Sequence, residues 1–121
     1  MPRIVRDREL NGRKETFNEL VQKGLGGFLV RNMESYGILD TMGLTSRIVL
    51  DANIYTMNNR AEAFWMEKGI LGDTVPLELN AKELVHRNNK NSELTVYGYT
   101  PMMVSVQCVQ KTMDHCNHAC A

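Results

Sequence analysis

The sequence predicts an α/β fold in which about five parallel β-strands alternate with four helices, as in a piece of a parallel α/β barrel or sheet. Short apolar runs recur along the chain, and the central ones are continuously apolar, which is typical of strands buried on both faces of a sheet. Between these runs lie segments with helical periodicity, bounded by residues that begin and end helices. Right-handed βαβ crossovers are the expected connections.

The five expected strands are short and evenly spread. They are Arg3–Val5, Gly27–Arg31, Arg47–Asp51, Thr74–Leu79 and Leu94–Gly98. Pro76 lies inside the fourth of them and has no N–H to donate to a ladder. That strand is therefore expected to begin at the proline, to bulge there, or to lie at an edge of the sheet.

Asparagine precedes three of the four expected helices, where its side chain can accept hydrogen bonds from the first free amides. The expected caps are Asn32, Asn59 and Asn80. Glutamate follows the last two caps at a distance of three residues, a pattern typical of a capping box. The first helix is predicted from the helical spacing of Phe17 and Val21.

The composition sets limits on size and partners. The chain has 121 residues, which is enough for one domain but too few for a closed eight-unit β/α barrel of roughly 250 residues. Fourteen basic residues balance fourteen acidic ones, which excludes a global basic field for nucleic acid but leaves room for a local patch. The sequence has no membrane-length apolar run and no signal-peptide pattern, so we expect a cytoplasmic protein without a membrane partner.

Polar side chains follow the expected strands at their C-terminal ends, where parallel α/β folds bind ligands. Asp51 and Glu78 each follow an apolar run and are candidate catalytic carboxylates. Arg31, Asn53 and Tyr97 are candidate substrate-binding residues. A structural role remains open for the two carboxylates, such as a pair between Asp51 and Arg31 or a hydrogen bond to a backbone amide. Phosphate-binding glycine loops and the common hydrolase motifs are not present in the sequence.

The last fourteen residues differ in character from the rest. They contain all three cysteines, Cys108, Cys116 and Cys120, together with two histidines. An odd number of cysteines argues against a disulfide framework and leaves metal binding or free thiols. Thiolates are the ligands that zinc and iron–sulfur clusters prefer, but the spacing matches no standard zinc pattern. The alternative is an exposed tail whose cysteines bind nothing.

Three ordered blocks of the sequence resemble peptidase family U-32, the collagenase-like proteases. These blocks are Leu50–Asn58, Asp73–Asn80 and Val96–Ser105, and the last of them leads to Cys108. The segment Val30–Glu34 fits as well. The resemblance covers nearly the whole chain and is closest to the C-terminal barrel portion of the long, multi-segment members.

This resemblance implies a β/α barrel of the triosephosphate-isomerase (TIM) type, of which residues 1–107 would form about half. Better-understood relatives are iron–sulfur proteins that support oxygen-independent hydroxylation of RNA bases, in tRNA or rRNA, or of a ubiquinone precursor. Four cysteines hold a [4Fe-4S] cluster in such members, and the first two match Cys108 and Cys116. Residues 108–121 would then be half of an iron–sulfur site. Cys120 does not match the family pattern, and neither the second cysteine pair nor the family's Glu-x-Phe-x-x-Gly signature occurs in the sequence.

Three hypotheses of function follow. The first is a fragment of a family U-32 protein whose full-length parent holds the [4Fe-4S] cluster and supports hydroxylation of an RNA base. The second is a collagenase-like peptidase, a hydrolase with a peptide substrate, in which a metal-bound water, Cys108 or Ser105 would attack. The third is a non-enzymatic module that completes another chain's barrel, through self-association or a partner chain, since an incomplete barrel exposes strand edges and apolar faces.

Overall fold

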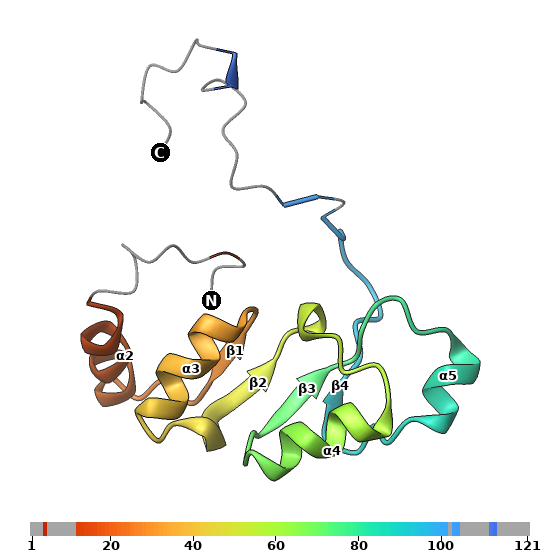
Figure 1. The fold of residues 1–121 in the computed structure, drawn as a ribbon, viewed down its shortest axis with the longest axis horizontal. Coiled ribbons are helices and arrows are strands. Elements are labelled where there is room, and N and C mark those ends of the chain that lie inside the picture. Colours follow the sequence, from red (N-terminus) through yellow and green to blue (C-terminus); the bar gives the residue numbers. More distant parts are fainter. Residues whose placement is uncertain (1–3, 5–11, 102, 105–111, 114–121) are drawn as a thin grey trace.

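Four strands alternate with four α-helices in the described part of the computed structural model (Figure 1). The structure describes residue 4 and residues 12–101, 103–104 and 112–113. In chain order the elements are α2 (Arg13–Gln22), β1 (Phe28–Val30), α3 (Met33–Thr41), the 3-10 turn η1 (Thr45–Arg47), β2 (Ile48–Leu50), the 3-10 turn η2 (Ala52–Ile54), α4 (Asn59–Glu67), β3 (Gly72–Thr74), α5 (Ala81–His86) and β4 (Ser92–Glu93). None of the helices in these ranges is both long enough and apolar enough to cross a bilayer.

The four strands form one all-parallel sheet with the order β1-β2-β3-β4. One helix separates each pair of consecutive strands, which confirms the predicted α/β class. One row of aligned residues crosses the whole sheet and consists of Val30, Leu50, Asp73 and Ser92. Because strand order follows chain order, right-handed crossovers place α3, α4 and α5 on the same face of the sheet.

That face of the sheet carries the hydrophobic core. The core consists of Phe17, Phe28, Val30, Leu39, Ile48, Leu50, Trp65 and Ile70, and so joins α2, α3 and α4 to β1 and β2. The middle residues of these two strands, Leu29 and Val49, are only half-buried. Because side chains alternate along a strand, Leu29 and Val49 point to the opposite face, and Arg31 and Asp51 share that direction two residues later.

The described residues contain four strands and not the five predicted, and two of the four lie earlier than predicted. The run Arg3–Val5 lies outside the described residues apart from Ile4. The strand predicted at Thr74–Leu79 lies earlier, because the N–H of Val75 still donates to the carbonyl oxygen of Glu93 at 2.9 Å but Pro76 has no N–H to continue the ladder. The strand predicted at Leu94–Gly98 also lies earlier, at β4, since the short β3 offers no ladder beyond that point.

Two of the three predicted caps are confirmed. The Asn32 side chain accepts a hydrogen bond from the Ser35 amide at 2.8 Å, and Asn80 forms a full capping box with Glu83. The cap predicted at Asn59 is wrong, because Asn58 caps α4. The Asn59 side chain instead bridges to α5 and the residues after it, since it donates to the His86 carbonyl oxygen and accepts from the Asn88 amide.

Candidate functional site

A groove of about 470 Å³ lies beside the C-terminal ends of β2 and β3. It is lined by Asp51, Ala52, Asn53 and Tyr55 after β2, by Thr74, Leu77 and Glu78 at and after the end of β3, and by Thr95, Gly98, Tyr99, Thr100, Pro101, Met103 and Val104 after β4. The groove therefore brings together three of the residues selected from the sequence, Asp51, Asn53 and Glu78. All of its lining residues except Thr95 belong to the three sequence blocks 50–58, 73–80 and 96–105.

Asp51 is the most heavily bonded side chain of the groove. Its Oδ2 accepts from Arg31 Nε at 2.9 Å, and its Oδ1 accepts from the Asn53 amide at 3.1 Å and from the Asn53 side-chain Nδ2. Burial of the Asp51 carboxyl acts to raise its pKa, but the hydrogen bonds from Asn53 and the charge of Arg31 outweigh that effect and hold the pKa below its ordinary value. Asp51 is therefore an ionised group that orients its neighbours, and a weak proton acceptor.

Both structural roles left open for Asp51 are thus present, the pair with Arg31 and the bond to a backbone amide. Glu78 differs, because its carboxylate has no hydrogen bond to any described residue. Of the two predicted catalytic carboxylates, Glu78 is therefore the one whose oxygens are free to accept a hydrogen bond from a ligand.

The remaining predicted site residues lie in different places. Arg31 borders the groove through its ion pair with Asp51 but does not line it. Tyr97 is 90% exposed and is not a lining residue. The predicted cluster ligands Cys108 and Cys116 lie outside the described residues.

Tyr55 lies on the groove wall in an uncommon backbone conformation. Its φ of 58° and ψ of 51° place it in the left-handed region, which costs a non-glycine residue about 1–2 kcal/mol. Its side chain is 53% exposed. The left-handed residue ends η2 and turns the chain back toward Thr56, so this geometry sets the path of the whole segment 51–57.

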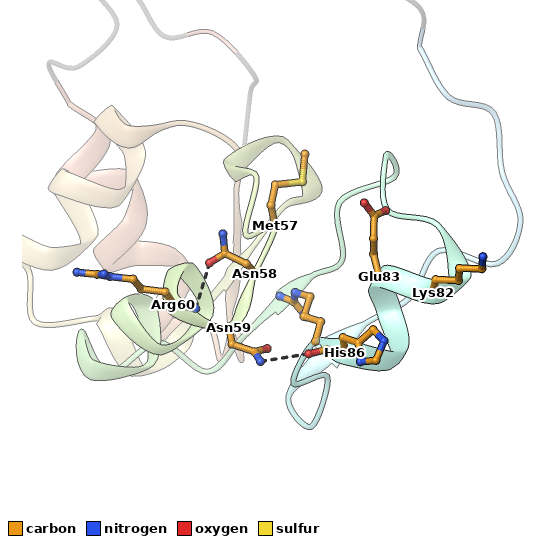
Figure 2. A pocket seen from close by; sticks show the side chains of 8 residues that line it. Met57, Asn58, Asn59, Arg60, Lys82, Glu83 and His86 are labelled. Atoms are coloured by element: carbon orange, nitrogen blue, oxygen red, sulfur yellow. Dashed lines mark hydrogen bonds between the residues drawn. The ribbon is translucent and has the colours of Figure 1, made fainter.

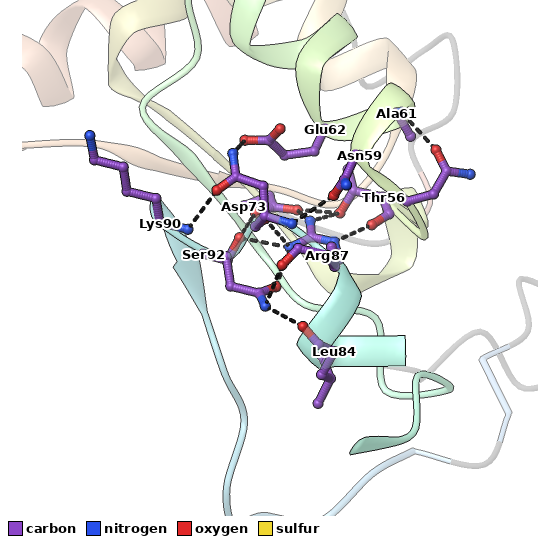
Figure 3. Close-up of polar contacts among 12 residues, drawn as sticks. Thr56, Asn59, Ala61, Glu62, Asp73, Leu84, Arg87, Lys90 and Ser92 are labelled. Atoms are coloured by element: carbon purple, nitrogen blue, oxygen red, sulfur yellow. Dashed lines mark hydrogen bonds and ion pairs between the residues drawn. The ribbon is translucent and has the colours of Figure 1, made fainter. Parts of the chain in front are cut away.

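A buried polar cluster that the sequence did not reveal lies behind this segment (Figure 3). Asp73 and Arg87 form an ion pair in which both side chains are 1% exposed. Arg87 Nε donates to the Thr56 carbonyl oxygen at 2.8 Å, and Ser92 Oγ donates to Asp73 Oδ1 at 2.5 Å. We call Thr56, Asp73, Arg87 and Ser92 the Arg87 network. The sequence feature that could have indicated this cluster is Asp73, a charged residue within the strand β3.

A second, wider cleft of about 630 Å³ lies between α4 and α5 (Figure 2). Arg60, Lys82 and His86 are among its lining residues, which gives it a basic character. The Arg60 and Lys82 side chains extend in opposite directions, away from each other. These charges do not converge on one point, so the groove after β2 and β3 is the better candidate for a ligand site.

Comparisons with known proteins gave no relative. No protein-family model matches the chain, and neither the search of curated proteins nor the search of solved structures found a match.

Proposed function

We propose that this chain is a segment of a peptidase family U-32 protein and that the groove is its substrate site. This proposal is supported by the position of the three sequence blocks that carry the resemblance, because all three line the groove. Blocks 50–58, 73–80 and 96–105 are far apart in the sequence, yet together they supply every lining residue of the groove except Thr95. Residues drawn from separate segments to one surface hollow are typical of a ligand-binding site, because a purely structural role favours the core.

In this proposal the sheet is an arc of a TIM-type β/α barrel. The strands are parallel, their order in space follows their order in the chain, and a helix follows each of the first three. Such barrels bind their ligands at the C-terminal ends of the strands, and the groove lies at that end of β2 and β3.

The activity that we propose for the full-length parent is oxygen-independent hydroxylation of a base in tRNA or rRNA. Cys108 and Cys116 would supply two thiolate ligands to a [4Fe-4S] cluster, which would provide the electron-transfer chemistry. In the groove, Asp51 would keep Arg31 and Asn53 in fixed orientations toward the substrate. Glu78 would accept a hydrogen bond or a proton from it.

The cluster is tested by anaerobic reconstitution with iron and sulfide, using the longest reading frame that contains this sequence. We expect bound iron and the visible absorption of a cluster. Cys108→Ser and Cys116→Ser should each remove both signals, whereas Cys120→Ser should keep them. A colourless, iron-free product from the unmodified protein would refute the iron–sulfur proposal.

The RNA substrate is tested separately in the source organism. Deletion of the gene should remove a hydroxylated nucleoside from digests of tRNA or rRNA analysed by mass spectrometry. A plasmid copy should restore it, and a copy with Glu78→Gln should not. Unchanged nucleoside profiles after deletion would contradict a role in RNA modification.

The second candidate is a collagenase-like peptidase, which is favoured by the presence of two carboxylates, Asp51 and Glu78, in one groove. Its test is cleavage of gelatin by the purified protein. Glu78→Gln should abolish cleavage, and Glu67→Gln, at an exposed position of α4, should not. Full activity in the Glu78→Gln variant would exclude this carboxylate from the reaction.

A further inference from the structure

We propose that Arg31 binds an oxyanion group of the groove's ligand, a phosphate or a carboxylate, and that Asp51 holds the arginine in the orientation required. This inference deepens the proposed function, since it assumes that the ligand lies in the groove. It names the chemical group of the ligand that Arg31 contacts.

The first observation is the set of donors that Arg31 leaves unused. A guanidinium carries five N–H donors in a planar fork. Arg31 uses Nε toward Asp51 Oδ2 at 2.9 Å, and no described residue accepts from Nη1 or Nη2. The side chain is 36% exposed. Two parallel N–H groups on one edge match the two oxygens of a phosphate or carboxylate.

The second observation is that both oxygens of Asp51 are already hydrogen-bonded within the protein. It is only 13% exposed, and its two oxygens are occupied by Arg31 and Asn53. A carboxylate that fixes the Nε side of an arginine restricts rotation of the guanidinium, so less rotamer entropy is lost when the Nη edge binds an anion. Asp51 is therefore a positioning residue, and Arg31 makes the contact.

The third observation concerns the position of the pair. Arg31 follows Val30 and Asp51 follows Leu50, and these two preceding residues are aligned in the sheet. Arg31 thus lies at the C-terminal edge, on the face opposite the helices, next to the groove. The α3 helix begins two residues later at Met33, and the partial positive charge of its N-terminus adds to the attraction for an anion.

Asn53 extends the description of the ligand. Its Nδ2 donates one N–H to Asp51, and its Oδ1 has no hydrogen-bond partner among the described residues. A carbonyl oxygen at this point accepts from an N–H or O–H of the ligand. The site is therefore suited to an oxyanion with a neighbouring hydrogen-bond donor.

Arg87 shows the contrast with a purely structural arginine. All three of its nitrogens donate to acceptors in the protein, and its side chain is 1% exposed. Such a group has no donor left for a ligand. Arg31 has the same kind of carboxylate neighbour but keeps one edge open.

The test is an NMR titration of the full chain with inorganic phosphate and, in a separate series, with acetate, followed through the backbone amide resonances of residue 31, Asp51 and Asn53, which all the variants below retain. We expect saturable shifts with at least one of the two anions. Saturation by phosphate alone assigns a phosphate-bearing ligand, and saturation by acetate alone assigns a carboxylate. Absence of saturable shifts with both anions overturns the proposal.

Variants separate a specific site from general charge. Arg31→Gln should abolish binding, and Arg31→Lys, which keeps the charge but loses the fork, should weaken it about tenfold, which corresponds to about 1.4 kcal/mol. Arg47→Gln, at a different arginine, should leave it unchanged. If Arg31→Lys binds as tightly as the unmodified protein, or Arg47→Gln binds as weakly as Arg31→Gln, the anion is an adventitious ion only and the proposal fails.

This titration needs neither a cluster nor catalytic activity. A failed reconstitution would therefore refute the proposed function and leave the anion site standing. A failed titration combined with a loaded cluster would refute the anion site alone.

Discussion

Arg87 and Asp73 form an ion pair that is closed off from solvent, with 1% of each side chain exposed. Asp73 lies in β3, and Arg87 follows the last residue of α5. Thr56 and Ser92 also donate to the Asp73 carboxylate, so both of its oxygens are satisfied. The pair therefore joins β3 and β4 to the connection that follows β2 and to the connection that follows α5.

Loss of one member of this pair should be strongly destabilising. Arg87→Met leaves the Asp73 carboxylate buried without its charge partner, and we expect the free energy of unfolding to fall by about 3–5 kcal/mol. Urea unfolding followed by circular dichroism measures the change. The double variant Asp73→Leu/Arg87→Met should recover much of the loss, because it removes both charges. A single variant as stable as the unmodified chain would contradict the buried pair.

The lowered pKa of Asp51 predicts a pH dependence of stability. A carboxyl with a folded-state pKa below its unfolded value of about 3.8 stabilises the fold fully above that value. This contribution is lost as the pH falls through the lower, folded-state pKa. Asp51→Asn should therefore flatten the acid limb of a plot of unfolding free energy against pH. Asp40→Asn, at an exposed position of α3, is the control and should leave that limb unchanged.

Gly72 should tolerate no side chain, whereas Gly37 should. A Cβ at Gly72 would collide with the backbone carbonyl oxygen of Asn91, so we expect Gly72→Ala to cost about 1–3 kcal/mol. Gly37 lies inside α3 with open space at its Cβ position, and Gly37→Ala should stabilise by roughly 0.5–1 kcal/mol. Thermal unfolding of the two variants should show shifts of opposite sign. A Gly72→Ala variant as stable as the unmodified chain would be inconsistent with the close approach of Asn91 to Gly72.

The cap of α4 can be assigned by substitution. The Asn58 side chain accepts from the Arg60 amide at 3.1 Å and from the Ala61 amide at 3.0 Å. Asn58→Ala should therefore cost about 1 kcal/mol of stability, while Asn58→Asp should keep most of it, because aspartate caps equally well. Chemical denaturation measures both. If Asn58→Ala proved neutral, α4 would have a different first residue.

The parts of the fold that the sequence predicts well are those decided by neighbouring residues. Apolar runs locate β1 and β2, and the spacing of Asn80 and Glu83 locates the start of α5. β3 and β4 are set by pairing instead. Position 72 requires glycine because the Asn91 carbonyl oxygen lies close to it. Asp73 is paired with Arg87, which lies fourteen residues further along the chain. The strand propensities of single residues do not predict either of these long-range contacts.

The candidate site shows the same division. Asp51, Asn53 and Glu78 follow strands, and the rule that parallel folds bind ligands at strand ends predicts their shared position correctly. Tyr97 does not line the groove, although Thr95 and Gly98 on either side of it do, and its side chain is 90% exposed. Arg87 follows a helix, and no strand-end rule points to it.

The Arg87 network also determines how the groove can open. β4 has only two residues, and beside its backbone ladder it is held to β3 by Ser92, whose hydroxyl donates to Asp73 and accepts from Arg87. If residues 87–95 detach in a local unfolding event, the wall after β4 leaves with them and Thr56 loses its anchor. Amide hydrogen exchange of β4 and of segment 51–57 should then proceed at one common rate, slower than in the loop before α5. The groove would then fold and unfold as a single cooperative unit, together with β4.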